Sequence, residues 1–419
     1  MHILFISNAF PRPNEPGNSQ PWQMAIHWIR KHYKVSVITN IRHYMTDRKL
    51  TKKPKLVKRI KEKKGMDIYE ILTPAGRRRS IFRRIINYFS FGILAFFVGL
   101  RVKSVDIVYV RTPPPIINFF GWFLTRLKGN IPYVLEIADL HPESAVSLGL
   151  TKSKLLITLW EKWENFFQNK ADLIVAIVPR IKKILIEKGI PSSKIIVTTN
   201  AYDPLTEKEL CNIPKEIDEL FNRLKEKFIL IYTGTMALKE NLETAIQAAK
   251  IIQEKGYKDI GFVYVGEGDK KKKLKEMCKR LSISNCIFCN PVPRTCIPDV
   301  LAKADVAFYC LYKEPFQGYT LPNKFFEYLG NGRAIIYAGT GIVAEILKTA
   351  KCGIVVPPEN PEAFAQVVIY LYTHKDEARA MGLRGQEYVL THFNRERILE
   401  KLNKRLLQLL QSKGWIEES

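Results

Sequence analysis

The sequence predicts an α/β protein built from two doubly wound domains, each a parallel sheet covered by helices. Short apolar runs alternate with longer amphipathic stretches along the whole chain. Near-continuous apolar runs are typical of strands that are buried on both faces of a parallel sheet. The chain has 419 residues, of which 46% are hydrophobic. This length exceeds one ordinary core and suits two domains of roughly 200 residues.

The first half of the chain begins with an apolar run at 3–7, a loop at 8–20 rich in Pro and Asn, and a helix pattern at 21–32. Later apolar runs predict further strands at 35–39, 67–72, 107–110, 133–137, 173–177 and 195–198. Helical stretches lie between them, notably 152–167 and 180–188. The alternation loosens after residue 200, so we place the first domain at residues 1–204.

The alternation restarts with a buried strand at 228–232 that ends close to Gly234. Further strands are expected at 261–265, 286–288, 306–309, 334–337 and 353–356. We place the second domain at residues 205–390. The last helix, about 395–412, is long and amphipathic, and we expect the segment 391–419 to cross back to the first domain. Doubly wound sheets bind ligands at the carboxyl ends of their strands, which predicts a site in a cleft between two facing domains.

Positive charge is concentrated in the first half of the chain. The formal net charge is +25, and residues 1–200 hold 34 Lys+Arg against 13 Asp+Glu, a net of +21. The remainder holds 32 against 28, a net of +4. A charge that served only solubility would be spread more evenly, so we expect the first half to face something anionic. Nucleic acid, a phospholipid surface and a phosphorylated acceptor all fit.

All seven cysteines lie between residues 211 and 352, at irregular intervals. The odd count and irregular spacing predict free thiols in a reducing compartment. Cys286 and Cys289 form a C-x2-C pair, but no fourth ligand follows at zinc-finger spacing, so we expect no metal site. The chain opens directly on strand-like residues without a cleavable leader, and we therefore expect a cytoplasmic protein.

A basic and apolar segment spans residues 77–103, with seven basic residues and no acidic one. Its apolar part, 85–100, has 16 residues, fewer than the roughly 20 that a spanning helix needs. We expect a helix that lies in the membrane interface, with its arginines among phosphates. The alternative is an ordinary buried helix. The expected membrane contacts are Arg77, Arg78, Arg79, Arg83 and Arg84. A second basic patch, 41–64, has 11 Lys+Arg and is expected to be a loop or exposed helix.

Several strings resemble glycosyltransferase family 4. Val265-Gly-Glu-Gly-Asp looks like the V-G-x-G-p segment of GT-B glycosyltransferases, and Leu321-Pro-Asn-Lys-Phe-Phe-Glu-Tyr-Leu resembles the P-S-K-x-F-E-Y segment of family 4. In the first half, Glu136-Ile-Ala-Asp-Leu-His-Pro-Glu-Ser-Ala is similar to E-v-R-D-L-W-P-E-S-A of the WbuB-like N-acetyl-fucosamine transferase branch. Val110-Arg-Thr-Pro-Pro-Pro matches the t-s-P-P-P turn of that branch. These strings span nearly the whole chain in the expected order.

The resemblance implies the GT-B fold, in which two Rossmann-like doubly wound domains face each other across a cleft. It also implies a retaining transfer from a nucleotide-sugar without a cofactor or a protein-bound metal. No D-x-D pair occurs in the sequence. The leaving diphosphate must then be neutralised by basic side chains and helix N-termini.

The donor site departs from the pattern of the family. Glu327 is the position that binds the donor ribose in family 4. The usual phosphate-binding Arg and Lys are replaced by Thr235 and Glu240, and Tyr319 stands where the family has a further acid. We therefore expect Lys324 to neutralise the diphosphate, unless it is only a surface lysine, with help from Lys239 and from N–H groups near Asn241. The expected donor-binding residues are Gly234, Thr235, Lys239, Gly266, Glu267, Lys324 and Glu327.

The acceptor hydroxyl needs a group that takes its proton as the new bond forms. Asp139 is the first candidate, followed by His141 and Glu143, because all three follow the strand at 133–137. Glu143 capping a helix and His141 packing in the core are the alternatives. Gly17 and Asn18, in the first strand–helix loop, are candidates for binding the acceptor or simply form a turn.

The function that these features favour is a family 4 glycosyltransferase of the hexosyl or N-acetylhexosaminyl type, using a UDP-sugar. The expected acceptor is a lipid-diphosphate-linked saccharide in surface polysaccharide biosynthesis, at the inner face of the membrane. A UDP-sugar 2-epimerase of the same fold is the first alternative, although it needs no basic docking face. A nucleic-acid-binding protein is the second, although no binding module accompanies the charge. A dinucleotide dehydrogenase is disfavoured because no G-x-G-x-x-G follows the first strand.

Overall fold

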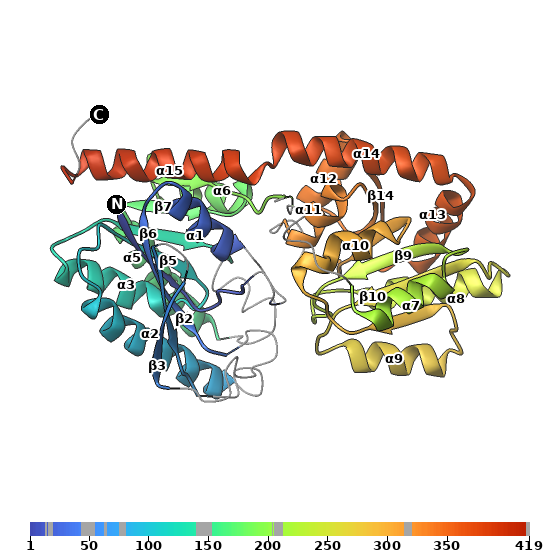
Figure 1. Ribbon diagram of the computed structural model, residues 1–419, viewed down its shortest axis with the longest axis horizontal. Helices are drawn as coiled ribbons and strands as arrows, with labels where there is room; N and C mark the ends of the chain where they lie inside the picture. The colour runs from blue at the N-terminus through green and yellow to red at the C-terminus, as the bar shows by residue number, and fades with distance from the viewer. Residues whose placement is uncertain are drawn as a thin grey trace. The chain divides into compact units, whose positions relative to one another are not determined.

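The computed structural model describes residues 1–12, 15, 20–42, 55–62, 65–74, 81–139, 153–202, 204, 213–313 and 321–415. The chain divides into two compact units. The first comprises Met1–Arg12, Asn18–Thr199 and Glu396–Ser419, and the second comprises Pro13–Gly17 and Asn200–Arg395. Each unit is a sheet covered by helices (Figure 1).

The sheet of the first unit has eight strands in the order β3-β4-β2-β1-β5-β6-β7-β8. All neighbouring pairs are parallel except β3 and β4. The strands at the seven positions expected from the apolar runs are β1 (His2–Ser7), β2 (Lys34–Asn40), β4 (Met66–Ile71), β5 (Ile107–Thr112), β6 (Tyr133–Ile137), β7 (Leu173–Ala176) and β8 (Ile195–Val197).

Strand β3 (Val57–Lys61) corrects the expectation that the whole basic patch at 41–64 forms a loop or an exposed helix. The strand is antiparallel to β4, and Arg59 donates two hydrogen bonds to Asp67, at 3.2 and 2.9 Å. It lies at the edge of the sheet, where charged side chains are common because they discourage pairing with other chains. A strand with so many basic residues carries no buried-strand pattern.

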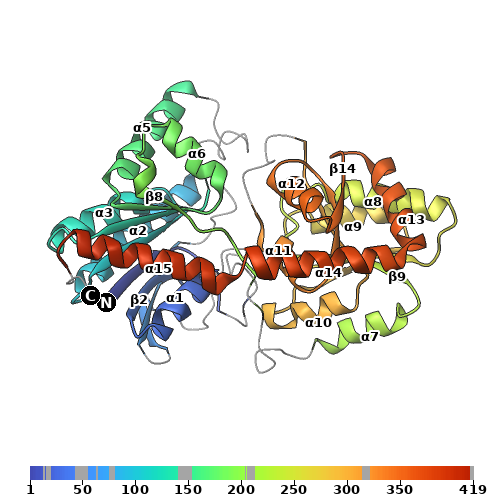
Figure 2. The same ribbon diagram turned by 90° about the horizontal axis from the view of Figure 1, so that it is seen from above.

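Two layers of helices cover this sheet. Helix α1 (Gln20–Arg30) and helix α15 (Arg395–Ser412) share one core with the sheet, in which Trp28 and Leu402 lie with Phe5. Side chains alternate along a strand, so Leu4 and Val110 face the opposite side. There they contact helix α2 (Ile81–Arg101) and helix α3 (Ile117–Leu127). Helices α5 (Lys154–Lys170) and α6 (Pro179–Glu187) complete the unit (Figure 2).

Helix α2 is longer than the apolar run that predicted it. Over Phe82–Arg101 it is long and apolar enough to cross a membrane by length and composition, with a mean hydropathy of 1.3. However, one face of the helix is part of the core of the unit, through Phe91, Ala95 and Val98. The helix therefore lies along the sheet rather than standing apart from it.

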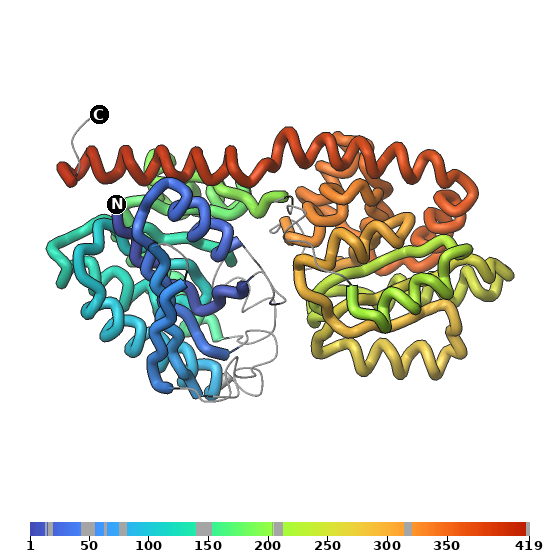
Figure 3. Tube along the Cα trace, viewed as in Figure 1, coloured from blue at the N-terminus to red at the C-terminus, as the bar shows by residue number. Residues whose placement is uncertain are grey.

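The sheet of the second unit has six parallel strands in the order β11-β10-β9-β12-β13-β14. They confirm the expected positions and are β9 (Phe228–Thr233), β10 (Ile260–Val265), β11 (Cys286–Cys289), β12 (Val306–Cys310), β13 (Ala334–Ala338) and β14 (Gly353–Val356). The helices are α7 (Lys215–Arg223), α8 (Leu242–Glu254), α9 (Lys271–Arg280), α10 (Ile297–Ala302), α11 (Asn323–Gly330), α12 (Ile342–Thr349), α13 (Pro361–Thr373) and α14 (Lys375–His392). Figure 3 traces the chain from α14 into α15, which ends close to the N-terminus.

Candidate functional site

Two loops of the second unit run side by side beyond the carboxyl ends of β9 and β10. Met236 N–H donates to the carbonyl of Glu267 at 2.9 Å, and Lys270 N–H donates back to the carbonyl of Met236 at 3.1 Å. Gly234 N–H donates to the carbonyl of Val265 at 2.9 Å. In a parallel sheet this edge is where ligands bind, so both loops occupy the expected place for a site.

Glycines allow the two loops to approach this closely. A Cβ added to Gly266 would lie 1.9 Å from the carbonyl oxygen of Gly234. A Cβ added to Gly268 would lie 2.3 Å from the carbonyl oxygen of Met236. Any other side chain would have to push the backbones apart. The space that these two glycines leave is therefore used by the neighbouring loop.

Lys324 lies in the first turn of α11 and reaches back over the end of β9. Its Nζ donates to the Tyr232 hydroxyl at 2.6 Å and lies 3.2 Å from Glu240 Oε1. The ammonium also lies 4.1 Å from the ring centroid of Tyr232 and 4.8 Å from that of Tyr309. Burial lowers the pKa of Lys324, and the charge of Glu240 opposes this shift. The lysine is thus no ordinary surface residue.

Glu240 stands where the family pattern expects a lysine. Its side chain is only 4% exposed, and it forms an ion pair with Lys324, whose side chain is 11% exposed. Its second oxygen, Oε2, has no hydrogen-bond partner among the described residues. The site therefore holds a buried cation that is already paired with a carboxylate of the protein itself.

Glu327 lies one turn further along α11. Its Oε1 is 3.5 Å from Nε of Arg294, in the turn that follows β11. Burial raises the pKa of Glu327, and Arg294, Arg395 and Lys324 act against that rise. Tyr328 fixes the helix in place, because its hydroxyl accepts from the N–H of Thr233 at 2.7 Å. Arg294 was not named from the sequence, and its position after a strand on the same sheet edge was the available signal.

The remaining predicted donor residues surround Lys324 less tightly. The positive charge of Lys239 is among the causes that lower the pKa of Lys324, and the carbonyl of Thr235 accepts from the Tyr232 hydroxyl at 2.7 Å. Glu267 is partly exposed and lies 3.3 Å from Lys271. The N–H of Asn241 itself donates to the carbonyl of Cys310 at 3.0 Å, and the assistance expected from N–H groups near Asn241 stays a prediction.

Two buried lysines that the sequence did not single out hold the loops together. Lys270 Nζ donates to the Glu240 carbonyl at 2.9 Å and to Glu243 Oε2 at 2.5 Å. Lys271 Nζ donates to the carbonyl of Gly266 at 2.8 Å and to that of Cys289 at 2.9 Å. Both belong to a run of four lysines, which by itself does not distinguish buried members from exposed ones.

In the first unit, Asp139 is exposed and lies two residues beyond the end of β6. His141 and Glu143, like Gly17 and Asn18, lie outside the described residues, as do Arg77, Arg78 and Arg79. Three residues before Asp139, in β6, the buried Glu136 accepts hydrogen bonds from Arg111 at 2.5 Å and from the Tyr109 hydroxyl at 2.8 Å. This buried pair fixes the end of β6 on which Asp139 is carried.

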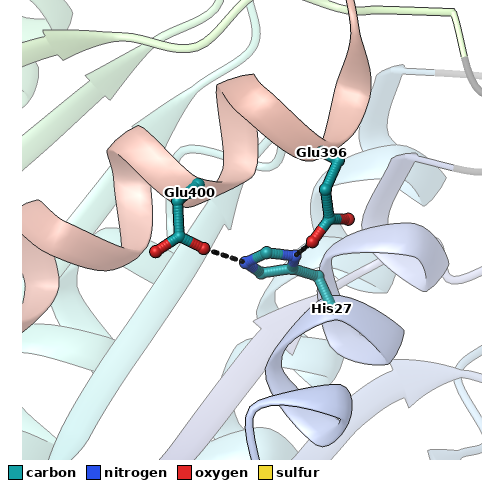
Figure 4. Close-up of side chains that lie close together, drawn as sticks. All are labelled: His27, Glu396 and Glu400. Carbon is teal, nitrogen blue, oxygen red and sulfur yellow. Dashed lines mark ion pairs between the residues drawn. The ribbon is translucent and has the colours of Figure 1, made fainter.

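Among the described residues of the first unit, one group of side chains has ligand atoms close enough for a metal ion. His27, Glu396 and Glu400 have them within 4.8 Å of one another. Figure 4 shows that the carboxylates face opposite nitrogens of the ring: Nδ1 is 3.2 Å from Glu396 and Nε2 is 3.9 Å from Glu400. A single ion cannot use both ring nitrogens, and Lys31 already pairs with Glu400 at 2.8 Å. The group is better suited to ion pairs that hold α15 on α1.

Cysteines of the second unit depart from the prediction at one position. Cys296 is disulfide-bonded, so the expectation of free thiols throughout is wrong there. The described free cysteines are Cys278, Cys286, Cys289, Cys310 and Cys352.

Comparison with known proteins matches residues 215–388 to the family model of glycosyl transferases group 1. This range contains the loops, Lys324 and Glu327. The chain carries a glycosyl transferases group 1 domain. The match supports a glycosyltransferase, and nothing in it separates the WbuB-like branch from the rest of the family.

Similar proteins extend the likeness to both units. The chain is 24% identical over 336 residues to WcaI of Escherichia coli K12, assigned as a glycosyl transferase of colanic acid biosynthesis, covering 76% of this chain and 80% of that one. Sucrose-phosphate synthase of Thermosynechococcus elongatus has a TM-score of 0.72 at 16% identity, over 98% and 99% of the two chains. HepE of Anabaena in complex with UDP-glucose has a TM-score of 0.69 at 14% identity, over 97% and 100%. The fold of the chain is GT-B.

Proposed function

We propose that this glycosyltransferase moves a sugar from a UDP-sugar to a lipid-diphosphate-linked saccharide, with retention at the anomeric carbon, in surface polysaccharide biosynthesis. The observation that carries the proposal is the position of Lys324 and Glu327 at the carboxyl edge of the second sheet, inside the matched domain. The relation to WcaI supports a polysaccharide product, and the likeness to HepE supports a UDP-sugar. An N-acetylated sugar, as in the WbuB-like branch, is part of the proposal.

The donor is held by groups on helix α11 and on two loops. Glu327 accepts hydrogen bonds from the ribose hydroxyls, and Arg294 opposes the rise in the pKa of this carboxylate that burial causes. Lys324 and Lys239 neutralise the diphosphate, so the proposal requires no metal ion or other cofactor. Gly234, Thr235, Gly266 and Glu267 line the path of the diphosphate and sugar. The diphosphate takes the place of the Glu240 carboxylate at Lys324.

The acceptor reacts beside Asp139. As its hydroxyl bonds to the anomeric carbon, the bond from that carbon to the diphosphate oxygen breaks, and Asp139 takes the hydroxyl proton. The exposure of Asp139 suits that role, because it leaves the carboxylate open to a ligand. His141 and Glu143 assist, and Gly17 and Asn18 contact the acceptor. We place the enzyme in the cytoplasm at the inner face of the membrane, where Arg77, Arg78, Arg79, Arg83 and Arg84 meet lipid phosphates.

Calorimetry with UDP-, GDP- and ADP-sugars tests the donor, since UDP-sugars should bind and the others should not. Each bound donor is then incubated with a polyprenyl-diphosphate N-acetylhexosamine, and the new linkage is assigned by NMR. A product with the anomeric configuration of the donor is expected. An inverted linkage refutes retention, and release of an epimerised UDP-sugar without an acceptor would establish the epimerase instead.

A further inference from the structure

Large apolar side chains are exposed along the outer face of α2. Phe82 is 68% exposed and Phe97 is 50% exposed, and Phe89 and Ile93 lie between them on the same face. The inner face of the helix is buried against the sheet. A helix that is apolar on both faces has a second surface that the fold of the unit leaves uncovered.

The same surface continues across α3 and α5. Ring contacts connect the three helices: Phe96 of α2 stacks on Phe123 at 5.5 Å, and Phe119 lies 6.0 Å from Trp163 of α5. Helix α5 extends the surface with Leu155, which is 70% exposed, and with Leu159, which is 54% exposed. The views in Figures 1 and 2 show α2, α3 and α5 as neighbours.

The charges around this surface point to an anionic partner. Helices α2 and α3 carry four arginines and no acidic residue. Helix α5 carries three lysines and two glutamates, of which Glu164 is buried and bonds to Asn118. A second copy would bring the same positive charge against this face, which disfavours self-association. Crossing a bilayer would take α2 off the sheet and expose its buried face.

We propose that the outer faces of α2, α3 and α5 together form a docking surface for an anionic lipid bilayer. The apolar side chains enter the boundary between headgroups and acyl chains, and the flanking arginines and lysines meet lipid phosphates. The contribution of α5 lies outside the segment 77–103 that the sequence indicates. The inference rests on the proposed function in that a lipid-linked acceptor requires a bilayer, but docking itself needs neither donor nor acceptor.

Vesicle co-sedimentation tests the role of α5 directly. The full-length protein is mixed with vesicles of phosphatidylcholine, with or without 30% phosphatidylglycerol. Leu155→Ser with Leu159→Ser is compared with a matched control on α14, Leu383→Ser with Leu390→Ser, whose leucines are 64% and 42% exposed. We expect the α5 variant to bind anionic vesicles about tenfold more weakly, and the control variant to bind like the wild type.

Four results would overturn the proposal: wild-type binding by the α5 variant, an equal loss in the control, binding that does not depend on phosphatidylglycerol, or a lipid-free dimer that only the α5 variant loses. Calorimetry with a UDP-sugar separates this proposal from the proposed function. Vesicle binding without UDP-sugar binding leaves the surface intact and refutes the function, and the opposite result refutes only the surface.

Discussion

Replacing Lys324 by Met removes the cation from a buried ion pair while keeping an apolar stem of similar length against Tyr232 and Tyr309. Glu240, whose side chain is 4% exposed, then has no cation to pair with, because Lys324 Nζ, 3.2 Å from Glu240 Oε1, has been removed. Removing one member of a buried pair costs about 3–5 kcal/mol.

The expected fall in the free energy of unfolding is therefore about 3–5 kcal/mol at pH 7. Adding Glu240→Gln removes the uncompensated charge. Buried pairs that are replaced by neutral groups of similar size often lose little stability, so the double variant should come within about 1 kcal/mol of the wild type.

The order of the variants by affinity for UDP should differ from their order by stability. The double variant folds but lacks the cation for the diphosphate, so its affinity for UDP should fall at least about tenfold, as expected for the loss of a charged hydrogen bond. Glu240→Gln alone frees Lys324 from its internal carboxylate and should bind UDP more tightly than the wild type. No purely structural role of the pair predicts that gain.

Urea unfolding and calorimetry provide the two measurements. All six tryptophans lie within the ranges of the first unit, so tryptophan fluorescence reports on that unit, whereas circular dichroism reports on both. The circular dichroism transition should shift more than the fluorescence transition. A double variant as unstable as Lys324→Met would refute the ion-pair argument. Weaker UDP binding by Glu240→Gln would refute the competition between carboxylate and diphosphate.

Other positions give sharp expectations. Arg294→Gln should raise the pKa of Glu327 further. Because UDP-sugar binding needs the carboxylate, affinity should be lost at a higher pH than in the wild type as the pH is lowered. Calorimetry across pH should show this loss, and the variant Glu327→Gln should show no such pH dependence. Gly266→Ala should lower stability by about 2–4 kcal/mol through its 1.9 Å clash, whereas Gly256→Ala, with open space at a positive φ, should cost about 1 kcal/mol in the same urea series. Asp139→Asn should lower kcat at least about tenfold without changing the Kd for the UDP-sugar, and an unchanged kcat would exclude it as the base.

The sequence predicted strands wherever burial on both faces leaves an apolar run, which holds for thirteen of the fourteen strands among the described residues. Strand β3 is the exception, because an edge strand satisfies its pairing through the backbone and leaves its side chains free to be charged. Its sequence, Val-Lys-Arg-Ile-Lys, therefore carries a surface composition rather than a strand pattern.

The candidate site divides in a similar way. Lys324 and Glu327 could be predicted from a local motif, because they lie in adjacent turns of helix α11. Arg294 lies 33 residues before Glu327, and the two meet only because the sheet order brings the ends of their segments to one edge. The contact of Lys270 with Glu243 depends in the same way on the sheet order, because Glu243 is in helix α8 after β9 and Lys270 precedes helix α9 after β10. Contacts of this kind are set by topology, which motif spacing does not encode.

Glu240 shows why a departure from a family pattern is not simply a loss. A lysine at that position would place a second cation beside Lys324, inside a shell of aromatic rings and backbone carbonyls where burial already lowers the pKa of Lys324. The carboxylate instead opposes that lowering of the pKa of Lys324 when no ligand is present. A diphosphate that displaces it supplies more negative charge than Glu240 gives up, so the exchange favours a doubly charged group over a single carboxylate. If the proposed donor site is right, the substitution replaces an excess of positive charge by a carboxylate with which the donor diphosphate competes for Lys324.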